Sequence, residues 1–320
     1  MYTGIEVLLY LQDFRFSAPV IIDNFFHLIS HPFLVGFFPV FLMAVLYWCY
    51  NKHAGTFLAF NIFTIGVCTS FLKLFLCVPR PWVICPEICP TNEAISGANG
   101  FSCPSGHTTS ATALFGSLAV IFRKFTYVPV LCIFVIALIG FSRMYLGVHT
   151  PIDVFFGLVL AGSLLWFNWH LLKFIDRNPQ MDWFVAFVSV GIIILFIASV
   201  LLRRYFGAYF DVDGVDIDVL IYAFTEFFHS IGWFVGFLFG WLLERKKIRF
   251  TIPLKITSRI LQGFCGLLLL LILQICLSEY LLPLLGIGIG KFLSNMFLGL
   301  FISAGYPWLF SFIRKKRVNR

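Results

Sequence analysis

The chain has 320 residues, of which 60% are hydrophobic and only 12% charged, with a mean hydropathy of +0.94 and a formal net charge of +8. A soluble domain carries roughly twice that charged fraction, so the composition excludes an ordinary soluble protein. A net positive charge can indicate nucleic-acid binding. Here the cations gather in short loops between apolar runs, which is typical of membrane topology and argues against nucleic acid as a partner.

The apolar runs predict an all-α, polytopic transmembrane helical bundle with about nine spans. Residues 16–30 contain Asp23, Asn24 and His27 among apolar residues, which predicts an interfacial helix rather than a span. The expected spans are residues 32–50, 55–77, 105–123, 126–145, 151–172, 182–202, 218–243, 256–283 and 291–313. We expect residues 1–177 to hold the interfacial helix and the first five spans, and residues 178–320 to form a four-span C-terminal membrane extension.

Most of the 23 Lys and Arg residues lie on one side of the membrane if the N-terminus is outside and the C-terminus is cytoplasmic. That orientation brings three polar motifs to the outer face. Spans 105–123 and 126–145 would form a hairpin that leaves and re-enters the same face. His107 and Arg143 can therefore meet although they are far apart in the sequence.

The first motif is Lys73, six further residues, and then Arg80-Pro81. Two helical turns separate the two cations, so they lie near one face. Pro79 and Pro81 should end or kink the helix and let Arg80 turn into a pocket. The alternative is a Lys that snorkels towards the headgroups and an Arg that contacts a lipid phosphate.

The second motif is Pro104-Ser105-Gly106-His107. Ser105 precedes an apolar run, which predicts a helix N-cap, and Gly106 permits close backbone approach. The start of that helix would offer free N–H groups to an anion. The alternative is a plain capped helix with a surface His107.

The third motif is Ser142-Arg143, five residues, His149, three residues, and Asp153. Thr150-Pro151 predicts the N-cap and first residue of a helix. Asp153 can complete a capping box with Thr150, or hold one ring nitrogen of His149 so that the other can attack, or do both. Arg143 offers a planar fork for phosphate oxygens.

Together these motifs resemble the three-part signature of the type 2 phosphatidic acid phosphatase superfamily, over about residues 45–170. The stretch from Ser142 to Pro151 is similar to bacterial members. The resemblance implies that His149 is the nucleophile that forms a phosphohistidine, that His107 protonates the leaving oxygen, and that Asp153 orients His149. It also implies that no metal or other cofactor is needed. The phosphate-binding residues that it implies are Lys73, Arg80, Ser105, Gly106 and Arg143.

The expected function is therefore hydrolysis of a lipid phosphate monoester or diphosphate at the outer membrane face. The expected partners are this lipid and the surrounding membrane lipids, and the expected location is the bacterial inner membrane with a periplasmic site. The nine-span layout also resembles sphingosine-1-phosphate phosphatases and glucose-6-phosphatases, so a sugar-phosphate phosphatase is an alternative. A second alternative is a non-catalytic transporter that only binds lipid headgroups. The oligomeric state is left open.

Two weaker groups stay open at this stage. Cys85 or Cys89 bridged to Cys103 would fix the loop before the second motif, but free thiols are equally compatible with the sequence. Glu226 and His229 lie three residues apart in a predicted span. They are either a satisfied structural pair or the lining of a polar pathway.

Overall fold

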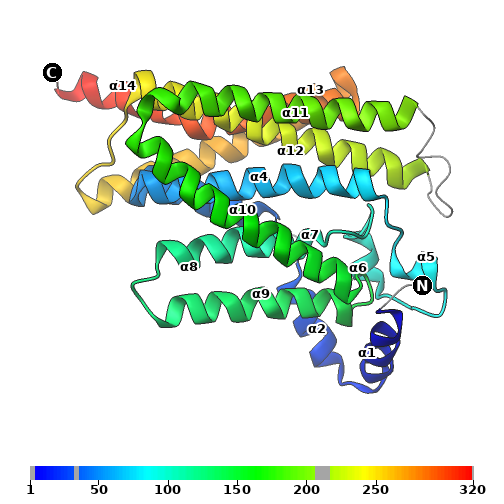
Figure 1. Cartoon of the computed structure of the whole chain (residues 1–320). Helices are drawn as coiled ribbons and strands as arrows, with labels where there is room; N and C mark the ends of the chain where they lie inside the picture. Colours follow the sequence, from blue (N-terminus) through cyan, green and yellow to red (C-terminus); the bar gives the residue numbers. More distant parts are fainter. Residues whose placement is uncertain (1–3, 32–35, 206–216, 319–320) are drawn as a thin grey trace. The chain divides into compact units, whose positions relative to one another are not determined.

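The computed structural model describes residues 4–31, 36–205 and 217–318. Within these ranges every regular element is a helix and no strand is present, so the predicted all-α class is confirmed for them (Figure 1). The described residues form two compact units. The units interleave along the chain, since unit 1 comprises 1–39, 64–167 and 197–224 and unit 2 the remainder. The division at residues 177 and 178 stays a prediction.

Unit 1 carries all three sequence motifs. Its complete helices are α1 (Ile5–Ser17), α2 (Val20–Ile29), α5 (Pro81–Ile84), α6 (Asn92–Ser96), α7 (Gly106–Ala111), the π-turn η3 (Thr112–Gly116), α8 (Ser117–Ile121) and α9 (Tyr127–Tyr145). It shares with unit 2 the long helices α4 (Lys52–Leu76), α10 (Pro151–Arg177), α11 (Asp182–Tyr205) and α12 (Ile217–Leu243).

The predicted hairpin is present as the continuous α7–η3–α8 segment, which lies alongside α9 (Figure 1). Small residues allow this close packing. A Cβ added to Gly140 would lie 3.8 Å from the Thr108 hydroxyl of α7 and 2.9 Å from Val154 of α10. The hairpin therefore brings the start of α7, the end of α9 and the start of α10 together.

The N-terminal residues form two helices that pack on α9. The predicted helix within 16–30 is present as α2, and α1 precedes it across Ala18 and Pro19. Phe26 is buried, and its ring centroid lies 4.3 Å from that of Tyr145. Aromatic pairs at this distance add to the burial of apolar surface, so α2 is held against the end of α9.

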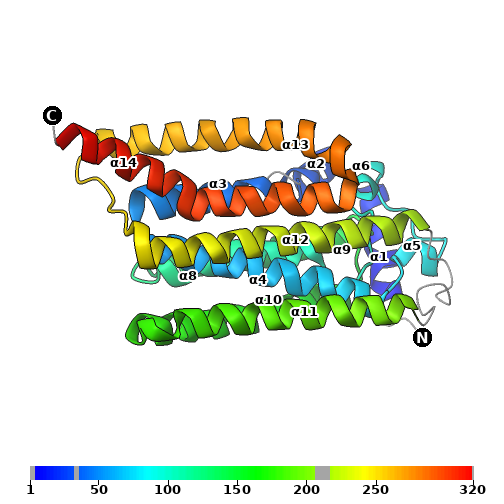
Figure 2. The ribbon, with the colours of Figure 1, turned by 90° about the horizontal axis from the view of Figure 1, so that it is seen from above.

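Unit 2 contains most of α3 (Phe38–Val45), then η2 (Leu46–Tyr50), the 3₁₀ turn η4 (Pro179–Met181), η5 (Glu244–Ile248), α13 (Ile256–Leu300), η6 (Phe301–Gly305) and α14 (Tyr306–Val318). The chain reverses direction within α13, so its two halves lie side by side (Figure 2). Pro283 precedes the reversal, and Gly286 takes a φ of 76°, which is unfavourable for residues with a side chain. The sequence placed a break between spans at this position.

Six described helical segments are long and apolar enough to cross a membrane. Of the predicted segment 32–50, residues 32–35 lie outside the described residues, and the rest contains the short apolar helix Phe38–Tyr50. The predicted segment 105–123 is helical over α7–α8 without reaching span length. The last two predicted spans fall in one helical run, Ile256–Arg314. The protein is thus a polytopic helical membrane protein, while the count of nine spans and the orientation of the termini stay predictions.

Candidate active site

The first motif begins in the last turn of α4, at Lys73, and continues through the non-helical turn that follows the helix. The helix ends at Leu76, and Arg80 takes an extended conformation before Pro81 begins α5. Arg80 is buried, and its Nε donates to the carbonyl of Gly100 at 2.6 Å while its Nη1 donates to the carbonyl of Val148 at 3.0 Å. The Arg thus joins the loops of the second and third motifs and points inward, as the flanking prolines predicted.

Lys73 reaches the second motif. A Cβ added to Gly106 would lie 3.5 Å from the Lys73 ammonium, so a side chain there would contact the cation. Ser105 occupies the N-cap position of α7, but its side chain makes no cap bond. Its Oγ accepts instead from the Thr108 hydroxyl at 3.0 Å. The predicted N-cap position is therefore confirmed, but the Ser105 oxygen bonds to a hydroxyl one turn later and not to a backbone N–H of the helix.

The second motif is fixed to the third through the backbone. Ser105 N–H donates to the carbonyl of Asp153 at 3.0 Å, and the preceding Cys103–Pro104 peptide is cis. A Cβ added to Gly157 would lie 3.2 Å from the Ser105 carbonyl, so α10 passes close to the start of α7. The three motifs therefore meet within unit 1.

The capping box predicted at the start of α10 is present. Thr150 N–H donates to Asp153 Oδ2 at 2.8 Å, and Asp153 N–H donates to the Thr150 hydroxyl at 3.3 Å. This arrangement satisfies two backbone donors that a helix start leaves unpaired. It also fixes the carboxylate of Asp153 beside the residue that precedes the helix, His149.

The structure determines which nitrogen of His149 carries the proton. Arg80 Nη1 lies 3.1 Å from His149 Nε2. A guanidinium can only donate, so Nε2 must accept and the proton must be on Nδ1. The lone pair available for attack on an electrophile is then the one on Nε2.

A serine lies between the two residues that the sequence paired. His149 Nδ1 is 3.7 Å from Asp153 Oδ2, too far for a direct hydrogen bond. Ser102 Oγ lies 3.4 Å from Nδ1 and donates to Asp153 Oδ2 at 2.7 Å. The contact between imidazole and carboxylate therefore runs through the Ser102 hydroxyl, a residue that sequence reasoning missed.

Burial lowers the pKa of His149 most, and the charge of Arg80 lowers it further, from 6.5 to about 3, against the opposing effect of Asp153. The imidazole is therefore neutral near pH 7, as a nucleophile must be. Burial and the charge of Asp153 also raise the pKa of the neighbouring Cys103 thiol to about 12, so that thiol stays protonated.

Arg143 lies in the same site, and its guanidinium is only partly satisfied. It is 2% exposed, its Nε has no hydrogen-bond partner in the described residues, and its charged neighbour is another cation, Arg80. An unpaired buried charge costs several kcal/mol, on the order of 3–5, unless an anion compensates it. The second imidazole, His107, is half-buried, and its Nε2 donates to the carbonyl of Ser30 at 3.1 Å.

Comparison with known proteins is consistent with this geometry. Residues 54–177 match the PAP2 superfamily, and residues 228–317 match the transmembrane extension of PAP2 superfamily phosphatases. The chain belongs to the PAP2 superfamily. The first match contains every predicted site residue, and the PAP2 domain therefore supplies both imidazoles, the carboxylate and the three cations.

Similar proteins include lipid phosphate phosphatase delta of Arabidopsis thaliana, 26% identical over 57% of this chain and 44% of that protein. A probable sphingosine-1-phosphate phosphatase of Dictyostelium discoideum is 31% identical over 55% of this chain and 47% of that protein. A lipid A 1-phosphatase of Rhizobium johnstonii is 28% identical over 37% and 47%. The chain thus spans just under half the length of these relatives. No solved structure matches it significantly.

The sequence left two further groups open, the cysteines and the pair Glu226 and His229. All nine cysteines are free, with Cys103 buried beside the PAP2 site and Cys89 exposed. In unit 2, Trp233 Nε1 donates to His229 Nε2 at 3.0 Å. His229 is therefore a hydrogen-bonded residue of α12, which favours the structural interpretation of the pair with Glu226.

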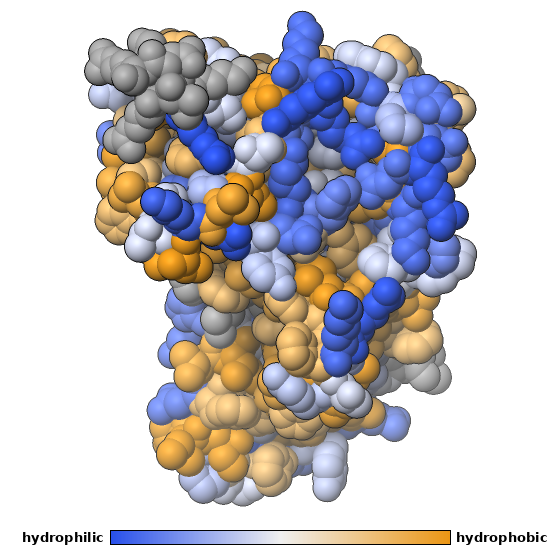
Figure 3. Space-filling model, turned by 90° about the vertical axis from the view of Figure 1, so that its left-hand side faces the viewer, coloured by the Kyte–Doolittle hydropathy of each residue, from blue (hydrophilic) through white to orange (hydrophobic). Residues whose placement is uncertain are grey.

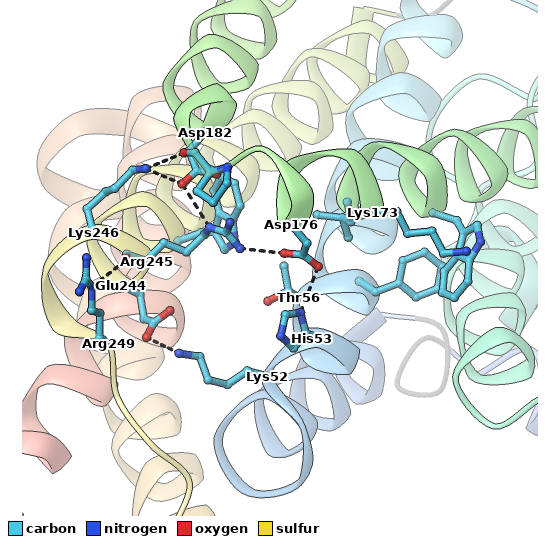
Figure 4. Close-up of a pocket in the computed structure, with 15 residues that line it drawn as sticks. Lys52, His53, Thr56, Lys173, Asp176, Asp182, Glu244, Arg245, Lys246 and Arg249 are labelled. Atoms are coloured by element: carbon cyan, nitrogen blue, oxygen red, sulfur yellow. Dashed lines mark hydrogen bonds and ion pairs between the residues drawn. The ribbon is translucent and has the colours of Figure 1, made fainter.

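A cavity of about 390 Å³ lies in unit 2 (Figure 4). Four ion pairs connect the residues that line this cavity. Lys52 pairs with Glu244 at 2.5 Å, and Lys246 pairs with Asp182 at 2.7 Å. Arg245 pairs with both Asp176, at 3.0 Å, and Asp182, at 3.2 Å. In the upper part of Figure 3, hydrophilic residues gather on one face. The carboxylates of this cavity are compensated by its own cations, unlike the guanidinium of Arg143, so we interpret it as a structural ion-pair network.

Proposed function

We propose that the chain is a membrane phosphatase that hydrolyses a phosphorylated lipid through a phosphohistidine on His149. The observation that carries the proposal is the buried Arg143, whose guanidinium Nε has no hydrogen-bond partner in the described residues and whose charge lies near that of Arg80. A phosphate group would compensate both charges. The planar fork of Arg suits its oxygens, and Lys73, the Ser105 hydroxyl and the Gly106 N–H would complete its binding.

In the first step His149 Nε2 attacks phosphorus, the bond from phosphorus to the leaving oxygen breaks, and protonated His107 gives that oxygen its proton. Arg80 would move from Nε2 onto the phosphoryl oxygens as the substrate enters. The charge on the imidazole then spreads towards Nδ1, where Ser102 and Asp153 stabilise it.

In the second step His107 takes a proton from water as the water oxygen attacks the phosphorus. The phosphorus–nitrogen bond breaks, and His149 regains its lone pair. Lys73, Arg80 and Arg143 supply the positive charge that a metal ion supplies in other phosphatases, so we expect no metal requirement.

The relatives support a lipid phosphate as substrate, since their names specify lipid phosphate, sphingosine 1-phosphate and lipid A. We further propose that residues 1–177 form the catalytic part and 178–320 the extension, and that the site faces the periplasm of a bacterial inner membrane. Exposed Cys89 tests the orientation. In a variant with Cys89 as its only cysteine, a membrane-impermeant maleimide should label intact cells, and labelling only after lysis would reverse the assignment.

The test of the activity is phosphate release by purified protein in detergent with EDTA. The panel is phosphatidic acid, a sphingoid-base phosphate, lipid A and glucose 6-phosphate. We expect release from a lipid phosphate in EDTA, loss in His149→Ala, and no loss in His170→Ala, which changes an exposed imidazole of α10. Faster release from glucose 6-phosphate would favour the sugar-phosphate alternative. Headgroup binding without release, unchanged in His149→Ala, would favour the transporter.

A further inference from the structure

We propose that the N-terminal helices α1 and α2, which precede the matched segment 54–177, contribute to the active site. They hold His107 in the tautomer protonated on Nε2, which leaves Nδ1 to exchange a proton with the leaving oxygen. This inference rests on the proposed function. It assigns Ser30 as a positioning residue that acts through its backbone carbonyl.

The contact fixes the state of the His107 ring. A carbonyl can only accept, so the 3.1 Å contact with Ser30 O places a proton on Nε2. The nitrogen left to exchange a proton with the leaving oxygen is Nδ1. When Nδ1 is also protonated, the ring is a cation that still donates to Ser30 O, so the carbonyl stabilises the acid form that the first step consumes.

The position of Ser30 in α2 strengthens this effect. Ser30 is the C-cap of α2, at the end where the last carbonyls of a helix have no partner within the helix. A helix C-terminus carries a partial negative charge, which favours a cation placed against it. Burial of the His107 ring disfavours its charged form most, the charges of Arg143, Lys73 and Arg80 disfavour it further, and the end of α2 opposes these effects.

Two hydrogen bonds hold α2 in this place. The Ser30 hydroxyl hydrogen-bonds the Ser142 hydroxyl. The Tyr145 hydroxyl donates to Asp23 Oδ1 at 2.6 Å. Both partners are on the last turns of α9, next to Arg143, so the carbonyl of Ser30 is positioned relative to the third motif.

Helix α1 is fixed by a buried cation. Arg15 is 5% exposed and donates to the carbonyl of Tyr145 at 3.1 Å and to the carbonyl of Cys89. Gln12 donates to the carbonyl of Glu87 at 3.0 Å and accepts from Cys89 N–H at 2.7 Å. Because a buried Arg and a buried Gln both hydrogen-bond backbone groups of other segments, we infer that α1 is fixed in one position.

The test compares substrates that differ in their need for a general acid. An alkyl phosphate has a poor leaving group and needs the proton, whereas p-nitrophenyl phosphate leaves as a stable anion. Arg15→Gln and the milder Ser142→Ala loosen α1–α2 without touching His107. We expect each to lower kcat/KM for the alkyl phosphate about tenfold and for p-nitrophenyl phosphate less than about threefold.

Ser17→Ala is the matched control, since its exposed hydroxyl donates to the carbonyls of Asp13 and Phe14 in its own helix. It should leave both rates unchanged. An equal loss on the two substrates, or no loss in either variant, would overturn the inference, because a merely structural role cannot discriminate between leaving groups.

Nitrogen-15 NMR of histidine-labelled protein separates this inference from the proposed function. With the signal assigned by His107→Gln, we expect His107 protonated on Nε2 in the wild type and a mixture of tautomers in Arg15→Gln. That result together with no phosphate release would refute the proposed function and leave the positioning role standing. A wild-type ring protonated on Nδ1 alone would refute the positioning role whatever the activity.

Discussion

Removing the Ser102 hydroxyl tests the link between His149 and Asp153 most directly. Ser102→Ala deletes the 2.7 Å hydrogen bond to Asp153 Oδ2 and the 3.4 Å contact with His149 Nδ1. A hydrogen bond to a charged group contributes about 1.5–3 kcal/mol. The carboxylate keeps the Thr150 N–H at 2.8 Å, so the lower end of that range applies. At about 1.4 kcal/mol for each factor of ten, kcat/KM should fall about tenfold.

The assay is initial-rate phosphate release in detergent on the best lipid substrate of the panel. Ser117→Ala is the control, because Ser117 is also fully buried and its hydroxyl bonds within its own helix, to the carbonyl of Ala113 at 2.6 Å. We expect Ser117→Ala to lose about as much stability as Ser102→Ala but to keep the wild-type kcat/KM. Thermal unfolding of both variants separates folding from catalysis.

A double-mutant cycle decides whether Ser102 acts through Asp153. Asp153→Asn alone should lower kcat/KM by about a hundredfold or more, by analogy with other His-orienting carboxylates. If the serine works through the carboxylate, adding Ser102→Ala to Asp153→Asn should cost less than about twofold, because coupled residues are not additive. A full tenfold loss in both backgrounds would refute the relay.

Three further predictions follow from the geometry. Because the Arg80 charge helps to lower the pKa of His149, the loss of kcat/KM as pH falls should begin at higher pH in Arg80→Gln than in the wild type, and coincident acid limbs would contradict this. Arg143→Lys keeps the charge but loses the fork, so the KM for phosphate esters should rise roughly tenfold or more, and an unchanged KM would exclude a bidentate contact. Gly236→Ala would place a Cβ 2.0 Å from the Met296 carbonyl and should lower the thermal unfolding temperature by several degrees, whereas Gly191→Ala, with nothing within 4 Å, should not.

Long apolar segments were the part of the fold that sequence could predict. The expected spans 126–145 and 151–172 correspond to α9 (Tyr127–Tyr145) and α10 (Pro151–Arg177), because hydropathy and the Thr150-Pro151 cap are local signals. The span count was not predictable in the same way. Whether 105–123 spans the membrane depends on what surrounds the short α7–α8 segment, and local hydropathy does not contain that information.

The candidate site shows the same limit. The sequence could reveal the cations and the imidazoles, because such side chains are conspicuous among apolar residues. These are Lys73, Arg80, His107, Arg143 and His149. Ser102 was missed, although a polar residue two positions before Pro104 could have been noted as a neighbour of the second motif. Ser30 contributes a backbone carbonyl, which every residue has, so no sequence pattern could have marked it.

The ion-pair network of unit 2 limits where the chain can be cut. It joins the start of α4 through Lys52, the end of α10 through Asp176, the start of α11 through Asp182, and η5, which directly follows α12, through Arg245. A fragment that stops at residue 177 would keep Lys52 and Asp176 but lose the Glu244 and Arg245 that neutralise them. The shortest independently expressed fragment of this protein should therefore extend through η5, and fusions or chimaeras that exchange the C-terminal helices must carry the matching charges with them.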